Sequence, residues 1–441
     1  MIEGAIGPDS NTDASQQFGG EGRLSDSTGV NALRIGMALA FLATLFVSCK
    51  LWLSARDYPH TPVWNGLPQP PHPFDYILYW GMAAALLGTA FLPNPRGALK
   101  VVCAIGIFWA ILDQSRWQPY VILYMAILAS LFAVPFERRR RWSTAEIDWA
   151  LLPARLAVAF AYLYSGLHKL NHQFVTEVFP WMIGPLHKMI HVDVNRLHGG
   201  WEIALALSVA AGEAAAGFLL LFLKTRRLAA LFLVTMHGFI LLMIGPFGYK
   251  WNVVVWPWNI AMPIALWALF WRRNAGSWPA PNLLSTRWWS VARTRSPLIL
   301  PTVVFCFGTL PILSFFGWWD SYLSFSLYSG SVCQCDIQID PEDYERMPPA
   351  AQAATDPDSG AVDQISWSMM ELGAMPYPEH RIALSVGRSL ARYARHGPVI
   401  VQLRDQPNVM TGKRKYRYVR FPPGGGGPPR RSATNESAMP H

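Results

Sequence analysis

Charged side chains are scarce in this chain of 441 residues: 15% are Asp, Glu, Lys or Arg, whereas 52% are hydrophobic. Soluble domains carry about 25% charged residues, so this balance excludes an ordinary soluble enzyme and indicates several membrane-spanning helices. The net charge is +9, but the basic residues occur as short clusters between apolar runs and do not line one patch. We therefore expect the lipid bilayer as a partner, and no nucleic acid.

Cysteine is also rare, with five residues, which is too few for a disulfide scaffold. Cys333 and Cys335 would project from the same face of a strand. A disulfide between them would close a small strained ring, and a lone Cys-x-Cys has too few ligands for a zinc site. Inert packing is favoured, and unpaired or redox-active thiols are the alternative.

Neither end of the chain has a long apolar run. Residues 1–30 are rich in Gly, Ser, Asp and Gln, which predicts a disordered cytoplasmic tail and not a cleaved signal peptide. Residues 422–441 have the composition of a second disordered tail.

The long apolar runs lie within residues 31–317. With about 20 residues per bilayer crossing, we predict an all-α polytopic membrane bundle of about nine transmembrane helices. The candidates cover residues 31–53, 73–92, 97–113, 118–135, 146–169, 201–223, 227–245, 252–271 and 297–317.

The loops between these helices differ in charge, and loops rich in Lys and Arg face the cytoplasm. The loops after the second, fourth, sixth and eighth helices hold fourteen basic residues: Arg96, Lys100, Arg138, Arg139, Arg140, Arg141, Lys224, Arg226, Arg227, Arg272, Arg273, Arg287, Arg293 and Arg295. The other loops hold five: Arg56, Arg116, Lys188, Arg196 and Lys250. We therefore predict a multi-pass protein, in the plasma (inner) membrane if bacterial, with a cytoplasmic N-terminus and a periplasmic or lumenal C-terminus.

Residues 318–421 have shorter apolar runs. The stretches "PVIVQLRD" and "RKYRYVRF" predict two strands around the turn "QPNVMTGK", and "YLSFSLYSGSVCQCDIQID" alternates in the same strand-like manner. About 100 residues suffice for a modest core. We predict a small β-rich or α+β exterior domain.

Under this orientation most polar residues of the helices converge on the outer half of the bilayer. They are Asp113, Arg116, Lys169, Glu202, Asn252 and Asn259, with Glu213 and His237 near the middle. A charged residue at the bilayer centre costs about 2.5–3.5 kcal/mol on insertion scales, so such residues usually face a bundle interior or cavity. Snorkelling near helix ends would also produce this shared depth.

One face of the fifth helix combines small and polar residues at helical spacing: Tyr162, Ser165, Gly166 and Lys169. Ser165 and Gly166 would let another helix or a ligand approach closely. From position alone, Lys169 is an ordinary snorkelling side chain at the interface. Glu213 could form an interhelical pair, and His237 a hydrogen-bonded helix contact.

The stretch "YLYSGLHKLN" resembles the Y-x-x-(A/S)-G-x-x-K-L-(D/N) motif of the vitamin K-dependent gamma-carboxylases and of the wider HTTM family, which shares their membrane domain. Two further stretches, "LDQSRWQPYVILY" and "MHGFILLMIGPFGYKWNV", are similar to other motifs of that family. The resemblance covers roughly residues 31–273. The exterior domain is much shorter than the lumenal region of the carboxylases.

The resemblance implies that Lys169 is a base that deprotonates a reduced quinone, such as vitamin K hydroquinone, and that a protein or peptide glutamate on the outer side is carboxylated. A lysine acts as a base only as the free amine, a form that burial favours. The chain departs from the carboxylases at Tyr120, where they have a histidine three residues after the motif tryptophan, here Trp117. The bacterial relatives share this version, so the resemblance does not by itself establish carboxylation.

We therefore expect a membrane enzyme that acts on a quinone-like lipid-soluble ligand in an outer-leaflet cavity. The candidate catalytic residues are Lys169, His168 and His237. The candidate ligand-binding residues are Asp113, Trp117, Tyr120, Tyr162, Gly166, Asn171 and Asn252. The alternative is a non-enzymatic membrane scaffold whose exterior domain binds a partner. A transporter ranks third, because the sequence shows no paired inverted halves.

Overall fold

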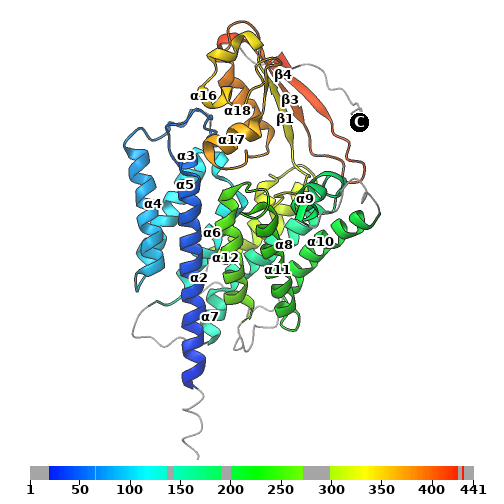
Figure 1. Ribbon diagram of the computed structural model, residues 1–441. Helices are drawn as coiled ribbons and strands as arrows, with labels where there is room; N and C mark the ends of the chain where they lie inside the picture. The colour runs from blue at the N-terminus through cyan, green and yellow to red at the C-terminus, as the bar shows by residue number, and fades with distance from the viewer. Residues whose placement is uncertain are drawn as a thin grey trace, which may run out of the picture.

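The computed structural model describes residues 19–64, 66–136, 144–189, 200–271, 298–425 and 430–431. A helical bundle lies below a smaller domain that contains a sheet (Figure 1). The predicted tail 422–441 and the basic loop residues Arg138 to Arg141 and Arg272 to Arg295 fall largely or wholly outside the described residues.

The bundle consists of long helices joined by short ones. The helices of more than 11 residues are α2 (Gly19–Val47), α4 (Phe74–Phe91), α5 (Arg96–Leu112), α6 (Pro119–Ser130), α8 (Leu152–Lys169), α10 (Gly200–Leu219) and α11 (Arg226–Ile244). The shorter ones are α3 (Cys49–Trp52), α7 (Thr144–Ala150), α9 (Phe179–Met189), α12 (Trp256–Leu266), α14 (Ile299–Val303) and α15 (Leu310–Ser314). Helix α2 begins at Gly19, inside the stretch predicted as a tail.

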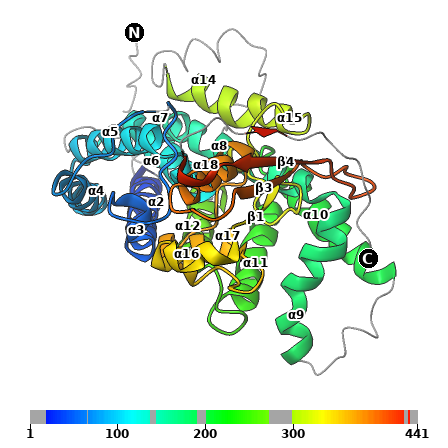
Figure 2. The same ribbon diagram turned by 90° about the horizontal axis from the view of Figure 1, so that it is seen from above.

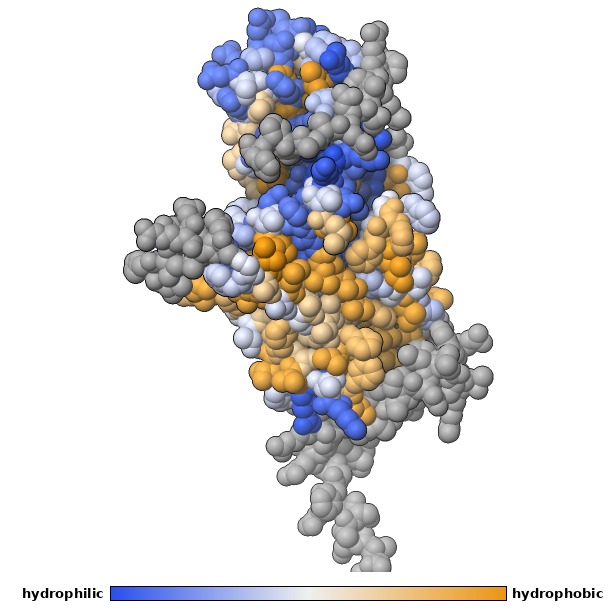
Figure 3. All heavy atoms as spheres, turned by 90° about the vertical axis from the view of Figure 1, so that its right-hand side faces the viewer, coloured by the Kyte–Doolittle hydropathy of each residue, from blue (hydrophilic) through white to orange (hydrophobic). Residues whose placement is uncertain are grey.

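Five helices among the described residues, not nine, are long and apolar enough to cross a membrane: Thr28–Val47, Phe74–Phe91, Gly200–Leu219, Arg226–Ile244 and Val253–Trp271. Pro119–Ala133 and Ile299–Ser314 are apolar but shorter. Helix α5 has only 17 residues, and α8 carries Arg155, His168 and Lys169. Figure 3 shows the apolar surface concentrated over the bundle and hydrophilic surface over the domain above it.

Helices α8 and α10 cross at very short range because each has a glycine at the contact. A Cβ on Gly166 of α8 would collide with the backbone nitrogen of Ala214 and lie 2.7 Å from the carbonyl oxygen of Ala210. A Cβ on Gly217 of α10 would lie 2.8 Å from the carbonyl oxygen of Ala159. Small residues at helix crossings allow such approach in membranes. The crossing fixes which side chains of α8 and α10 can meet.

The upper domain contains an antiparallel sheet of order β2-β1-β3-β4-β5. Its strands are β1 (Gln334–Gln338), β2 (Ala361–Val362), β3 (Val399–Arg404), β4 (Tyr416–Phe421) and β5 (Arg430–Arg431). Helices α16 (Pro349–Gln352), α17 (Gln364–Leu372) and α18 (His380–Leu390) complete an α+β domain. Seen from above, β1, β3 and β4 cross the centre of the bundle (Figure 2).

The two strands predicted around the turn are confirmed as β3 and β4. Residues of β3 alternate between buried and half-buried. The buried side chain of Val401 packs against α18 at Gly387, which has no side chain in its way. The stretch from Tyr322 to Asp340 was predicted as strand-like throughout, but only β1 is a strand. The reason is local: Phe325, Tyr328 and Gly330 have positive φ angles, which a regular strand does not contain.

The upper domain is attached to the bundle through a buried carboxylate. Glu371 of α17 accepts hydrogen bonds from the backbone N–H groups of Asp57 and Tyr58 and from Trp367 Nε1, the last two at 3.0 and 2.7 Å. Asp57 and Tyr58 belong to the loop between α3 and α4. This carboxylate is one of several polar contacts between the two parts, and its charge contributes to how they pack together.

We expect Glu371→Gln to weaken this attachment by about 2 kcal/mol. The neutral amide loses the charge-assisted hydrogen bonds, and its NH2 group would face N–H groups that are themselves donors. Amide hydrogen exchange at Asp57 and Tyr58 should accelerate about 30-fold, which corresponds to that free energy. The control is Glu345→Gln, since Glu345 is exposed. Unchanged exchange in Glu371→Gln would contradict the assignment.

Candidate functional site

The lysine at the end of α8 pairs with a carboxylate of α10. Lys169 Nζ lies 2.9 Å from Glu213 Oε2 and donates to Ser165 Oγ at 2.6 Å, one turn earlier on α8. Lys169 is 8% exposed and Glu213 is 4% exposed. The close crossing at Gly166 allows these two side chains to meet. The structure therefore holds a nearly dry ion pair, a kind of group that is costly to bury unless both partners are present.

A second polar chain links α8, α11 and α12. Tyr162 Oη lies 2.6 Å from His237 Nε2, and His237 Nδ1 lies 2.7 Å from Asn259 Oδ1. The Asn259 amide nitrogen donates to the carbonyl oxygen of Val255, so its oxygen faces the histidine as an acceptor. His237 Nδ1 then carries the proton, and Nε2 accepts a hydrogen bond from Tyr162. Tyr162 thus has a base in contact with its hydroxyl group.

The Lys169–Glu213 pair and the hydrogen-bonded chain from Tyr162 to Asn259 face the same cavity, of about 650 Å³, between the helices. Phe325, Leu327 and Tyr328, which follow the bundle in sequence, form part of its wall. Its walls are largely apolar, and its polar lining residues are Tyr120, Tyr162, Ser165, Lys169, Glu213, Thr235, His237, Asn259 and Tyr328. Tyr120 is 2% exposed, and its hydroxyl has no hydrogen-bond partner among the described residues. A buried hydroxyl without a partner is costly, so Tyr120 Oη is a natural contact for a polar group of a ligand.

Of the predicted site residues, the structure brings four together around this cavity: Lys169, His237, Tyr120 and Tyr162. The other six lie outside its lining. His168 contacts Ser314 Oγ at 3.0 Å and stacks on Phe315 at a ring distance of 4.3 Å, so it points towards α15 and not to Lys169. Adjacent residues of a helix are about 100° apart, which explains the divergence.

Asn171 and Gly166 have structural contacts. The Asn171 amide donates to the carbonyl oxygens of His168 and Ser329, and its oxygen accepts from the backbone N–H of Phe174 at 3.0 Å. All of these bonds connect the end of α8 to neighbouring segments. Gly166 contacts the backbone of α10, so a helix and not a ligand occupies the space left by its missing side chain.

Asp113 and Trp117 lie where the bundle meets the upper domain. The carboxylate of Asp113 is fully buried, pairs with Arg56 and accepts from the hydroxyl of Thr61 at 3.0 Å. Trp117 Nε1 donates to the carbonyl oxygen of Ala110 at 2.8 Å.

Asn252 contacts the site indirectly. It adopts a left-handed backbone conformation, with φ of 50°, and donates to Tyr328 Oη at 2.5 Å. Tyr328 lines the cavity, so Asn252 orients one of its walls.

Four polar lining residues were not among the predicted site residues: Glu213, Ser165, Asn259 and Tyr328. Glu213 was predicted only as a candidate for an interhelical pair. Depth in the membrane was the available signal for Glu213 and Asn259. Tyr328 belongs to a segment beyond the bundle, and its sequence gives no sign that it reaches the cavity.

The described residues contain no group of three or more His, Cys, Asp or Glu that could hold a metal ion. No family model, curated protein or solved structure matches the chain. Its function must therefore be argued from the site itself.

Proposed function

We propose that the chain is a membrane enzyme that binds a quinone-like, lipid-soluble molecule in the cavity and moves a proton at its hydroxyl group. The observation that carries this proposal is the buried Lys169–Glu213 pair facing an apolar cavity of about 650 Å³. Ligand sites are typically concave and apolar with a few convergent polar groups. The motifs around Lys169 and Trp117 support a place in the HTTM family.

The residues of the cavity fit a reduced quinone. An apolar ring and tail suit the apolar walls, and two hydroxyl groups suit the ion pair and the unpartnered hydroxyl of Tyr120. When bound, such a molecule supplies an acidic phenolic proton and two-electron redox chemistry. We place its polar groups near Lys169 and Tyr120.

Glu213 frees Lys169 to act as a base. An ammonium cannot accept a proton, but its extra proton can move to Glu213 Oε2, 2.9 Å away, which leaves the amine. When a bound ligand displaces the remaining water from the cavity, this transfer avoids the cost of two desolvated charges. The amine can then take a proton from a ligand hydroxyl within hydrogen-bond reach. Tyr162 keeps its proton and donates a hydrogen bond to His237 Nε2, which fixes the direction of its hydroxyl group in the cavity wall.

We also propose the finer topology: nine crossings, the N-terminus on the cytoplasmic side, and the upper domain outside. The charge difference between alternating loops supports this orientation. The cavity then lies near the outer leaflet, where a lipid-soluble ligand can enter from the bilayer.

The test begins with binding of a short-chain naphthoquinol to the purified full chain in detergent, measured by calorimetry. Oxygen uptake then reports oxidation of the quinol. Incorporation of labelled bicarbonate into a glutamate-rich peptide reports carboxylation. Binding with turnover supports the enzyme. Absence of both binding and turnover would favour the alternative, a membrane scaffold.

We expect Tyr120→Phe to weaken naphthoquinol binding about tenfold, because the ligand loses a hydrogen bond to a buried hydroxyl. The same substitution should leave the ligand-free protein as stable as before or slightly more stable, since it removes a hydroxyl without a partner. Tyr124→Phe is the control, because Tyr124 is fully buried but does not line the cavity. Equal losses of affinity in both variants would contradict the role of Tyr120.

A further inference from the structure

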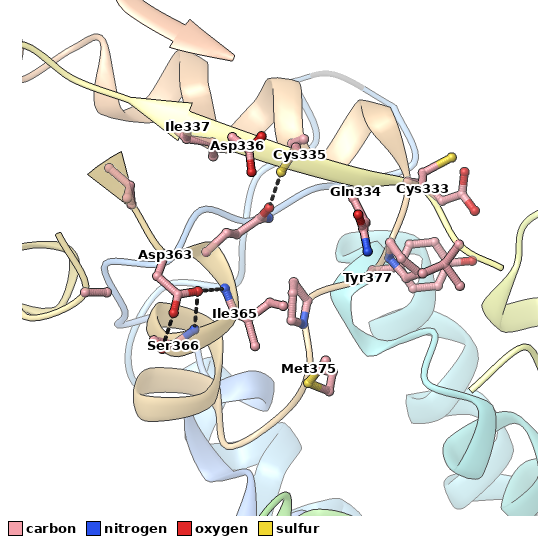
Figure 4. A pocket seen from close by; sticks show the side chains of 18 of the residues that line it. Cys333, Gln334, Cys335, Asp336, Ile337, Asp363, Ile365, Ser366, Met375 and Tyr377 are labelled. Carbon is pink, nitrogen blue, oxygen red and sulfur yellow. Dashed lines mark hydrogen bonds between the residues drawn. The ribbon is translucent and has the colours of Figure 1, made fainter. Parts of the chain in front are cut away.

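A second cavity, of about 860 Å³, lies in the upper domain. Strand β1 runs along one side, and the residues before β2, the start of α17 and the loop before α18 form the others (Figure 4). Cys333 and Cys335 both line it as free thiols, and burial raises the pKa of each to about 12. Such thiols are protonated at neutral pH and unreactive, so the cysteines contribute walls and not redox chemistry.

One edge of β1 is open inside this cavity. All five residues of β1 pair with β3, but on the opposite side β2 pairs only with Ile337 and Gln338. Within the described part of the chain, no strand covers that side of Gln334, Cys335 and Asp336, and all three line the cavity. An unpaired strand edge next to a cavity is the arrangement that accepts an extended peptide as an added strand.

The charged residues that line this cavity are of one sign. Asp336, Asp356, Asp363 and Glu379 line it, together with His380, whereas none of the described lining residues is Lys or Arg. Part of this charge is compensated, because Asp336 pairs with Arg404 and Asp363 caps α17. Glu379 Oε1 accepts from the backbone N–H of Ser321 at 3.0 Å, and its Oε2 lies 3.9 Å from Arg381, beyond hydrogen-bond distance. The negative charge that stays uncompensated attracts a cationic side chain and repels an acidic peptide.

We propose that the upper cavity binds an extended peptide segment that carries cationic side chains and pairs with the open edge of β1. Hydrogen bonds of the peptide backbone to β1 supply affinity, and Glu379 selects the cationic side chain. The cavity shares Leu327 and Tyr328 with the membrane cavity, so the bound segment lies one wall away from the Lys169 site. The proposal stands on the upper cavity alone and does not require the proposed quinol chemistry.

The probe is a fluorescent peptide of five residues, alternating lysine and valine with blocked ends, added to the full chain in detergent at physiological salt. Fluorescence anisotropy should show it binding at least about tenfold more tightly than the glutamate–valine counterpart. Methylation of alternate backbone nitrogens should weaken binding about tenfold, because it removes donors without changing charge.

Two variants test the site itself. Glu379→Gln should weaken the lysine–valine peptide about tenfold, and Glu345→Gln, which changes an exposed acid outside the cavity, should not. Equal binding of the acidic peptide, full binding of the methylated peptide, or equal effects of the two variants would overturn the proposal, as would no binding. The variant Lys169→Met with Glu213→Leu should leave peptide binding unchanged, which separates this site from the membrane cavity.

The pH dependence adds an independent readout. Burial and then the charge of Asp320 raise the pKa of Glu379 to about 7, against the opposing effects of the Ser321 N–H and Arg381. Glu379 gains its charge as pH rises through this range, so affinity for the cationic peptide should rise between about pH 6 and 8. Glu379→Gln should flatten the rise. The variant His380→Gln should retain the rise, because it keeps the Glu379 carboxylate, and a flat profile in His380→Gln would contradict the role of Glu379.

Discussion

Lys169→Met should lower the free energy of unfolding by about 3–5 kcal/mol, because it leaves the carboxylate of Glu213 buried without its partner. Glu213 is 4% exposed and faces largely apolar walls, so water replaces little of the interaction with the lost ammonium. Stability is measured by denaturant titration of the purified protein in bicelles. A loss below about 1 kcal/mol would mean that the pair is solvated, as surface pairs are.

The double variant Lys169→Met/Glu213→Leu separates structure from function. Replacing both members of a buried pair by apolar residues is often neutral or stabilising, so this variant should regain most of the lost stability. It should still fail to turn over naphthoquinol, because the cavity then has neither the amine nor the carboxylate. If the double variant is stable and fully active, Lys169 and Glu213 serve helix packing alone and the proposed chemistry is wrong.

The bundle was predictable from the sequence because apolar length and charge distribution follow directly from the solvent that a helix meets. Each of the nine predicted segments contains a helix, yet only five described helices have the length and hydropathy of a crossing. The shortfall at α8 has a physical reason: Arg155, His168 and Lys169 lower its hydropathy, and each has a polar partner inside the protein. Hydropathy thus underestimates a helix whose polar side chains are paired within the bundle.

The site was predictable only in part. The motif identified Lys169, and helical spacing placed Tyr162 on its face. The partner of Lys169 lies 44 residues further along the chain, and no local pattern connects the two positions. His168 and Asn171 were chosen because they are close to Lys169 in sequence, but the helix turns His168 away, and Asn171 lies beyond the end of the helix. Sequence proximity on a helix is therefore a weak guide to shared function.

Gly166→Ala should destabilise the bundle by about 3 kcal/mol or more, although alanine favours an isolated helix by about 1 kcal/mol over glycine. The added methyl group would collide with the backbone of α10 at Ala214, and a backbone cannot rotate away as a side chain can. Helices α8 and α10 would have to separate, which would also stretch the Lys169–Glu213 pair. We expect loss of monodisperse protein on size exclusion and loss of quinol binding.

Gly238→Ala is the matched control, because Gly238 is also in a helix but an added Cβ there meets nothing within 4 Å. This change should be neutral or stabilise α11 by up to about 1 kcal/mol. If Gly166→Ala behaves like Gly238→Ala, the two helices are not in backbone contact. The ion pair would then be held by flexible side chains across a wider gap, and the position of Lys169 would no longer follow from the helix crossing. If Gly166→Ala is destabilising and Gly238→Ala is not, the absence of a side chain at Gly166 explains why the ammonium of Lys169 and the carboxylate of Glu213 can meet inside this bundle.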